Sequence, residues 1–374
     1  GMLAGCAPKS ASEAQAQTAP AATGGLDPAD VDWKYETDVV IVGSGSGGTC
    51  AAIEAAEAGA DVVVFEKDKA MYGGNSALCG GYMLAAGWST QEEITGYAGD
   101  TGEAFANQML RWSQGLGNQD MIREACLRSG EAVDWMMDTG RTYEGASPLP
   151  PVWSCGDTEA DVVPRSVYNH NAYGATEGHM ATLKKRAESL SNIEIEMGCE
   201  VAHILKNAEG SVIGVQLADG SFAKARKGVV MACASVDNNL EMSKDLGLMQ
   251  NVWGLTLEGA GLLAPGNPDM DSNTGDGVRM LREIGAELCM QQAVCMNDSI
   301  YVGGISDWGM SEILGKDVNI HDSSNIDAIL VDKTGRRFCQ DDAEWGYVVH
   351  ECAQAAWKQG FTPDDPTTGY IFYV

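Results

Sequence analysis

The most constraining feature of this sequence is a strand, turn, helix and strand unit in residues 37–66. Residues 37–42, TDVVIV, form an apolar run rich in β-branched side chains, which predicts a buried parallel strand. Three glycines follow at G-x-G-x-x-G spacing: Gly43, Gly45 and Gly48. A helix-favouring stretch then leads to Gly59, the expected helix stop, and residues 61–67, DVVVFEK, predict a second strand carrying Glu66. This order of elements indicates an α/β fold of Rossmann type.

Each part of this unit has a physical task in binding a dinucleotide. Gly43 permits a tight turn, Gly45 lets a pyrophosphate approach the backbone at a helix N-terminus, and Gly48 lets that helix pack closely on the sheet. Glu66 lies twenty-three positions after Gly43, where a carboxylate is placed to accept hydrogen bonds from an adenosine ribose. The candidate contacts in this unit are Gly43, Gly45, Ser46, Gly48, Glu66 and Lys67. We therefore predict a dinucleotide site here.

A second glycine-rich loop, residues 73–81 with the sequence GGNSALCGG, follows the acidic residue. Nothing in the fingerprint of an NAD enzyme requires such a loop. The stretch resembles the FAD loop of the fumarate reductase and succinate dehydrogenase flavoprotein family, in which it runs toward the flavin ring. The resemblance implies flavin contacts at Gly74, Asn75, Ser76, Gly80 and Gly81. Family members that bind FAD covalently through histidine carry it in this loop, and since none is present here, the resemblance implies non-covalent FAD.

The resemblance continues in the same order along the chain. Residues 86–110 resemble the segment that opens a helical insertion in the wider family, which includes ketosteroid dehydrogenases. Residues 193–233 alternate apolar and polar side chains with turns near 207–210 and 219–220, which predicts a β-meander. In the family a strand here approaches the adenine through its backbone, which implies a contact at Val201.

Two later segments also resemble the family. NTGDGVRMLREIGAEL, residues 273–288, matches the T-G-D-G motif and its helix, which implies that Gly275 and Asp276 lie near the cofactor. DKTGRRFCQDDAEWGYV, residues 332–348, resembles the G-K-R-F-V-N-E segment of the mobile capping domain. The glutamate of that segment relays a proton in fumarate reductases and aligns with Asp341, so the resemblance implies that Asp341 is a candidate proton relay.

The expected architecture is an α/β, Rossmann-like FAD-binding domain of the two-dinucleotide-binding type, with a β-meander, a helical insertion and a partial α+β capping domain. We expect a flexible leader and linker in residues 1–35, the FAD-binding domain in 36–290 with its insertion at about 90–165, and the partial capping domain in 291–374. Family members resume the FAD domain after the cap, so the chain is expected to be a fragment.

The function that the resemblance implies is an FAD-dependent oxidoreductase acting on a carbon–carbon bond next to a carbonyl. It would reduce the C=C bond of an α,β-unsaturated carboxylate or enone by hydride transfer from flavin N5. Fumarate reductases carry His-Pro-Thr where this chain reads CMQQAVCMND after GAEL, which argues against fumarate itself. None of the eleven cysteines forms C-x-x-C, and metal ligation is not expected. The electrons are therefore expected from a donor protein or a soluble donor.

Two alternatives remain open at this stage. A ketosteroid-type dehydrogenase would run the reaction in reverse, with Tyr82, Trp88 and the VWSC and YNHNAY stretches lining an apolar pocket, unless these aromatic residues only pack. His170 and His179 are weak catalytic candidates, because a lone histidine here is as readily a helix cap or an exposed residue. The other alternative is a truncated, non-catalytic FAD-binding protein.

Charge and the N-terminus bear on partners and location. The net charge of −29 argues against nucleic acid and anionic membranes, and no run of eighteen apolar residues predicts a membrane span. Leu3-Ala4-Gly5-Cys6 resembles a bacterial lipoprotein box, followed by a polar, low-complexity tether. We therefore expect an extracytoplasmic bacterial protein, lipid-anchored through Cys6, with a cytoplasmic location as the alternative.

Overall fold

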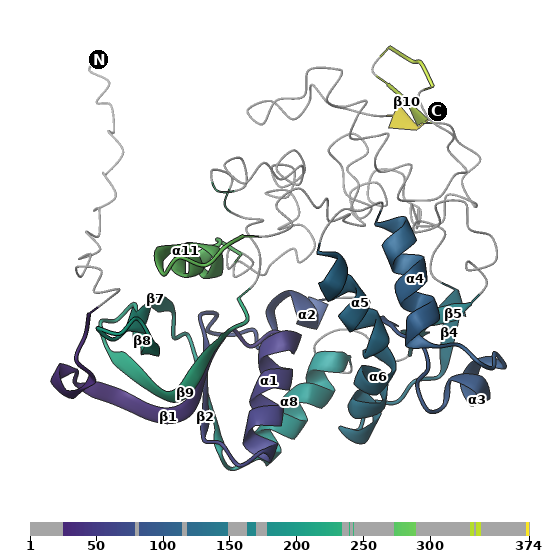
Figure 1. The fold of residues 1–374 in the computed structure, drawn as a ribbon. Coiled ribbons are helices and arrows are strands. Elements are labelled where there is room, and N and C mark those ends of the chain that lie inside the picture. The colour runs from purple at the N-terminus through teal and green to yellow at the C-terminus, as the bar shows by residue number, and fades with distance from the viewer. Residues whose placement is uncertain are drawn as a thin grey trace, which may run out of the picture.

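The largest sheet among the described residues has six strands in the order β6-β2-β1-β9-β8-β7, and Figure 1 shows it beside α1 (Ser46–Glu57) and α8 (His179–Ser189). The computed structural model describes residues 25–78, 82–113, 118–148, 163–169, 178–233, 239, 242, 273–288, 330–332, 334–337 and 372–373. The strands of this sheet are β1 (Trp33–Val42), β2 (Val62–Glu66), β6 (Ile193–Met197), β7 (Val201–Lys206), β8 (Val212–Leu217) and β9 (Phe222–Met231). β6, β2, β1 and β9 run parallel, whereas β8 and β7 continue the sheet in antiparallel pairing.

β2 and the second half of β1 are apolar on both faces because both faces of the sheet are covered there. Val40 and Phe65 belong to a core cluster that also contains Met280 of α11 (Asp276–Glu283). Ile41 and Val64 point to the opposite face, where α1 (Ser46–Glu57) covers them. Such two-sided burial produces a continuous hydrophobic run rather than a strict alternation. The prediction of a buried parallel strand at 37–42 is therefore confirmed.

The predicted stop of the first helix is also confirmed. Gly59 has φ +87°, a left-handed conformation that glycine adopts without strain. The Gly59 N–H donates to the carbonyl of Ala56, and the Ala60 N–H donates to the carbonyl of Ala55. These bonds satisfy carbonyls at the end of α1 and direct the chain into β2. Next to α1 lies α8 (His179–Ser189), whose Leu183 shares a buried cluster with Ile53 of α1.

The β-meander prediction for residues 193–233 is wrong for its first strand. β7, β8 and β9 form an antiparallel meander, and both expected turns are present, with Gly210 at φ +84° and Gly220 at φ +87°. β6 instead pairs in parallel with β2, at the other edge of the sheet. Its alternating sequence, IEIEM, arises because one face packs under α8 while the other carries Glu194 and Glu196. An alternating apolar and polar sequence shows that one face of a strand is buried, but it does not show which strand lies next to it.

The helices of residues 91–138 lie beyond α8, on the side away from β7 and β8 (Figure 1). They are α3 (Gln91–Thr95), α4 (Gly102–Trp112), α5 (Gln119–Leu127) and α6 (Ser129–Asp138). They adjoin a three-stranded antiparallel sheet of β3 (Met83–Leu84), β5 (Pro164–Tyr168) and β4 (Gly145–Pro148). A helical insertion within about 90–165 was expected, and helices are found there; the domain boundaries stay a prediction.

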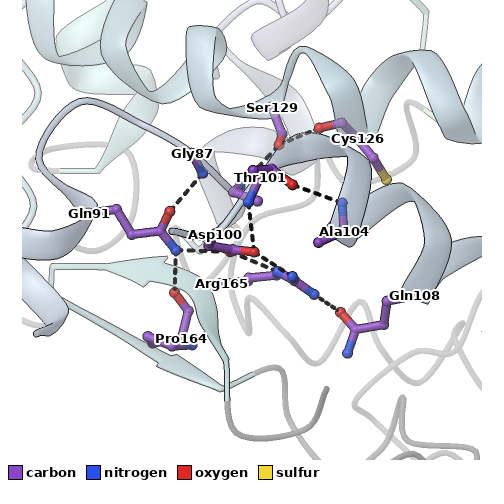
Figure 2. Close-up of polar contacts among 11 residues, drawn as sticks. Gly87, Gln91, Asp100, Thr101, Ala104, Gln108, Cys126, Ser129, Pro164 and Arg165 are labelled. Carbon is purple, nitrogen blue, oxygen red and sulfur yellow. Dashed lines mark hydrogen bonds and ion pairs between the residues drawn. The ribbon is translucent and has the colours of Figure 1, made fainter. Parts of the chain in front are cut away.

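A buried polar network joins these helices to the small sheet (Figure 2). Arg165 of β5 and Asp100 form a two-pronged ion pair with N–O distances of 2.9 and 2.5 Å, and their side chains are 4% and 1% exposed. Arg165 also donates to Gln108 of α4. The Gln91 amide donates to Asp100 at 3.0 Å and accepts from the backbone N–H of Gly87 at 2.6 Å. The network therefore anchors the chain that leaves β3 after the second glycine-rich loop.

The other described elements are short. They are a 3₁₀ helix, η1 (Pro28–Asp30), the helix α2 (Gly74–Leu78), and the antiparallel pair β10 (Leu330–Val331) and β11 (Phe372–Tyr373). Among the described residues, every helix is too short or too polar to cross a membrane.

Candidate functional site: a cleft at the glycine turn

The turn between β1 and α1 depends on two glycines for its shape. Gly43 has φ +101°, and a Cβ placed on it would lie 2.5 Å from the carbonyl oxygen of Ala232. A Cβ on Gly48 would lie 2.0 Å from the carbonyl oxygen of Gly43. Both distances are far below van der Waals contact, so no other residue fits without moving the backbone. The packing of β1, α1 and the end of β9 thus accounts for the first and third glycines of the motif.

Gly45 is different, because the protein's own structure does not require a glycine there. Its φ and ψ of −58° and 175° suit any residue, and a Cβ would make only ordinary contacts, the nearest being 3.5 Å from Ser76 Oγ. Gly45 is the N-cap of α1 and lines the cleft, and it makes no side-chain cap. A ligand that approaches the backbone at the positive end of this helix explains the missing side chain. The turn therefore fits the diphosphate of a dinucleotide.

Glu66 ends β2 and lines the same cleft. Its Oε2 accepts hydrogen bonds from the backbone N–H of Ser44 at 2.8 Å and from the Ser44 hydroxyl at 2.6 Å. Its Oε1 accepts one from the backbone N–H of Asp68 at 2.9 Å. A carboxylate oxygen has two lone pairs, so Oε1 keeps capacity for a further donor such as a ribose hydroxyl.

Lys67 and Asp276 close one side of the cleft as an ion pair. Lys67 Nζ lies 2.7 Å from Asp276 Oδ2 and 2.8 Å from the hydroxyl oxygen of Thr274. Burial alone would raise the pKa of the Asp276 carboxyl, but the hydrogen bonds from Lys67 and Thr274 outweigh it and the pKa is lowered. Gly275 precedes Asp276 with φ +79° and caps α11. The structure thus brings the T-G-D-G motif next to the residue that follows Glu66.

The second glycine-rich loop contacts the first at its start. Ser76 Oγ accepts a hydrogen bond from the Ser46 backbone N–H and donates one to the Ser46 hydroxyl, both at 3.1 Å. Gly74 and Ser76 line the cleft, and Asn75 lies between them in α2. The predicted contacts Gly80 and Gly81, the predicted relay Asp341, and His170 lie outside the described residues.

The cleft has a volume of about 350 Å³ and opens at the carboxyl ends of β1, β2 and β9. Ligands of open α/β sheets bind at this end of the strands, and pockets for small molecules measure about 300–1,000 Å³. Val201, 3% exposed at the start of β7, forms part of its wall. Ten predicted contacts line the cleft: Gly43, Gly45, Ser46, Glu66, Lys67, Gly74, Ser76, Val201, Gly275 and Asp276. Gly48 lies behind it, where it packs on Gly43.

Three residues considered for a ketosteroid pocket or for catalysis, Trp88, Tyr82 and His179, contact other side chains of the protein. Trp88 is 2% exposed and packs with Val133 and Val167 in a core cluster, while Tyr82 is 50% exposed and meets Tyr168 edge to face. For His179, the sequence left open a weak catalytic role, a helix cap or an exposed position, and the structure shows neither a cap nor exposure. It is 8% exposed at the first position of α8, makes no cap, and lies 3.3 Å from the Tyr143 hydroxyl.

Two polar side chains beneath the glycine turn were missed by sequence reasoning. Ser44 and Thr49 are fully buried, and the Thr49 hydroxyl pairs with that of Tyr72 at 2.7 Å. Burial raises the pKa of Tyr72 to about 12, so this phenol stays protonated. Ser44 occupies the variable position between two motif glycines, and only its small size and hydroxyl hinted at a role.

Comparisons with known proteins agree with this geometry. The chain is 27% identical over 273 residues to the urocanate reductase of Eggerthella lenta, covering 69% of this chain and 40% of that protein. It is 28% identical over 283 residues to the acrylate reductase flavoprotein subunit of Shewanella woodyi, covering 72% and 51%. The chain thus spans about half or less of the length of these relatives.

The fold is similar to that of a solved dehydrogenase. The crystal structure of 3-ketosteroid-Δ4-(5α)-dehydrogenase from Rhodococcus jostii RHA1 superposes with a TM-score of 0.61 at 22% identity, covering 88% of this chain and 66% of that one. At this identity the likeness concerns the fold. Residues 38–366 match the family described as FAD binding domain. Since this match extends over most of the sequence, the chain belongs to the FAD binding domain family.

Proposed function

We propose that the cleft at the glycine turn binds FAD non-covalently, with the adenosine ribose at Glu66 and the diphosphate at the N-terminus of α1. The observation that carries this proposal is Gly45, a cleft-lining glycine that neither backbone conformation nor packing requires. Glu66, at the end of β2, supports the ribose position because Oε1 keeps a free lone pair. Residues 73–81 contain no histidine, which supports non-covalent binding.

We further propose that the whole protein is an oxidoreductase that reduces the C=C bond of an α,β-unsaturated carboxylate or enone. The urocanate and acrylate reductases among its relatives support this substrate class. When bound, FAD supplies the hydride for such a reduction. The described residues of this chain bind and orient the adenosine half. Electrons would come from a separate donor protein or a soluble donor.

Spectroscopy on the purified chain, and on any longer form of the protein, tests both proposals. The chain is incubated with FAD, freed of excess nucleotide, and scanned for bound flavin in the visible range. Acid precipitation then separates non-covalent flavin, which enters the supernatant, from covalent flavin, which stays in the pellet. We expect the flavin in the supernatant.

The reaction is tested on the flavin-loaded protein without oxygen. Dithionite bleaches the flavin, and acrylate, urocanate, fumarate or an enone is added. Return of the oxidised spectrum with an acceptor, together with the saturated product, supports the reductase. Failure of every acceptor with the full-length protein contradicts it, and reduction of the flavin by a ketosteroid identifies the reverse reaction instead.

A further inference from the structure

Ser44 has an unusual combination of burial and hydrogen bonding. It lies between Gly43 and Gly45 in the turn after β1 and is 0% exposed. A buried hydroxyl must find partners, because an unsatisfied one costs about 1–3 kcal/mol. The hydrogen-bond partners of Ser44 show which segments of the chain it connects.

Two of these hydrogen bonds go to a single carboxylate oxygen. The backbone N–H and the hydroxyl of Ser44 both donate to Oε2 of Glu66, at 2.8 and 2.6 Å. Both lone pairs of Oε2 are thereby used. The carboxylate is fixed in plane and rotation, and the remaining acceptor capacity is concentrated on Oε1, which already receives the Asp68 N–H at 2.9 Å.

The other two link Ser44 to neighbouring segments. The Ser44 hydroxyl oxygen accepts from the backbone N–H of Gly73 at 2.8 Å, at the start of the second glycine-rich loop. The Ser44 carbonyl accepts from the Thr49 hydroxyl at 2.8 Å, within the first turns of α1. The Ser44 hydroxyl therefore connects Glu66 at the end of β2 to Gly73 at the start of the second glycine-rich loop.

We propose that Ser44 is a positioning residue that orients Glu66 toward the ribose hydroxyls of an adenine nucleotide. This inference rests on the proposed function of the cleft. A carboxylate held by Ser44 presents Oε1 in one geometry. Without the Ser44 hydroxyl, the backbone N–H groups of Ser44 and Asp68 still hold the carboxylate, but it is oriented less strictly and its bond to the ribose weakens. Ser44 thus sets the preference of the cleft for a ribose over a sugar that lacks hydroxyls.

The test compares ADP with 2′,3′-dideoxy-ADP, which lacks both ribose hydroxyls, by calorimetry on the whole chain. The original chain is expected to bind ADP at least about tenfold more tightly than the dideoxy nucleotide. Ser44→Ala is expected to weaken ADP about tenfold and leave the dideoxy nucleotide unchanged, so that the preference disappears. In a Glu66→Gln background, Ser44→Ala should have no further effect on ADP.

Thr49→Val is the matched control, since it removes a buried hydroxyl bonded to the same serine but not to Glu66. It should leave the nucleotide preference intact even if stability falls. Thermal unfolding verifies that each variant is folded, and Ser44→Cys, a similar side chain with a weaker donor, replaces Ser44→Ala if the latter is not. We expect a reduced preference for Ser44→Cys as well.

Three outcomes overturn the inference alone, and a fourth overturns the proposed function on which it rests. Equal weakening of both nucleotides by Ser44→Ala makes Ser44 a general structural residue, and an unchanged preference excludes any role through Glu66. If the original chain binds FAD and ADP but ignores the ribose hydroxyls, Ser44 has no such role while FAD binding stands. If it binds neither FAD nor ADP, the proposed function itself is wrong.

Discussion

At the scale of single residues, the three glycines of the first turn differ in the reason why a glycine occupies each position. Gly43 and Gly48 are required by the fold, because a Cβ at either would overlap backbone atoms. Gly45 is required by neither conformation nor packing. Substitutions at these positions therefore separate loss of folding from loss of binding.

Gly45→Val is expected to lower the affinity for FAD at least about a hundredfold while changing the free energy of unfolding by less than about 1 kcal/mol. The added side chain enters the cleft where the diphosphate would approach α1. Fluorescence titration with FAD and urea unfolding measure the two quantities. Gly228→Val is the control, since Gly228 lies in β9 with open space at its Cβ and outside the cleft. A stable Gly45→Val protein with undiminished affinity would contradict the assigned diphosphate position.

His179 predicts a loss of stability in mild acid. Burial, aided by the charge of Arg141, lowers its pKa from 6.5 to about 4. Between these values the unfolded chain binds a proton that the folded chain does not, so the free energy of unfolding falls as the pH falls, by about 1.4 kcal/mol per pH unit. The total loss of unfolding free energy reaches about 3 kcal/mol at pH 4. Well above pH 6.5, His179 is neutral in both the folded and the unfolded state and adds no pH dependence.

His179→Asn removes this titration, so its urea-unfolding free energy should depend less on pH. We expect the stability difference between the two proteins to shrink from about pH 7 to about pH 4.5. A parallel decline of both proteins would show that folding leaves the pKa of His179 unchanged.

The candidate site was predictable from sequence to the extent that spacing determines geometry. The glycine spacing and Glu66 identified the turn and the end of β2, since both follow from the local order of elements. The hydrogen bonds of the Ser44 hydroxyl and the burial of His179 were not predictable. Each depends on residues that are distant in sequence, such as Gly73 for Ser44 and Tyr143 for His179.

At the scale of elements, the polar network that joins the helices of residues 91–138 to β5 contains a buried ion pair between Asp100 and Arg165 (Figure 2). Asp100→Asn would leave the Arg165 guanidinium buried without its counter-charge. Breaking a buried pair in this way costs about 3–5 kcal/mol. We expect a loss of this size in urea unfolding.

Glu103→Gln provides the control for that loss. Glu103 pairs with Arg123 on the surface, where the two side chains are 51% and 42% exposed. Such exposed pairs contribute about 0–1 kcal/mol, so little change is expected. Equal losses in the two variants would mean that the Asp100 pair is as solvated as the surface one.

Elements were easier to predict than their neighbours. The apolar runs and helix stops identified β1, α1 and β2, since their causes are local. β6 was assigned to the meander because IEIEM has the period of any strand covered on one face. β6 pairs with β2 because α8, the helix that precedes it, packs on one face of the sheet. The chain thereby enters the sheet at the edge next to β2, which is opposite the edge formed by β7.

At the scale of the whole molecule, charge opposes the proposed cofactor. The chain carries a net charge of −29, and the charged residues that line the cleft are Glu66, Glu200, Asp276 and Lys67. Asp276 neutralises the one lysine among them. The attraction for a diphosphate therefore depends on short-range contacts with the backbone at the N-terminus of α1. Long-range repulsion should slow the approach of FAD.

Salt should therefore accelerate the association of FAD with the protein. Raising the ionic strength from about 20 mM to about 200 mM shortens the screening length severalfold and suppresses repulsion at a distance, whereas contacts inside the cleft are screened much less. We expect the association rate constant to rise severalfold and the dissociation rate constant to change less. Stopped-flow quenching of flavin fluorescence measures both, with sucrose of equal osmolality as the control for non-ionic effects. An association rate that falls with salt would mean that positive charge guides the cofactor, which would contradict the net negative charge of the described residues that line this cleft.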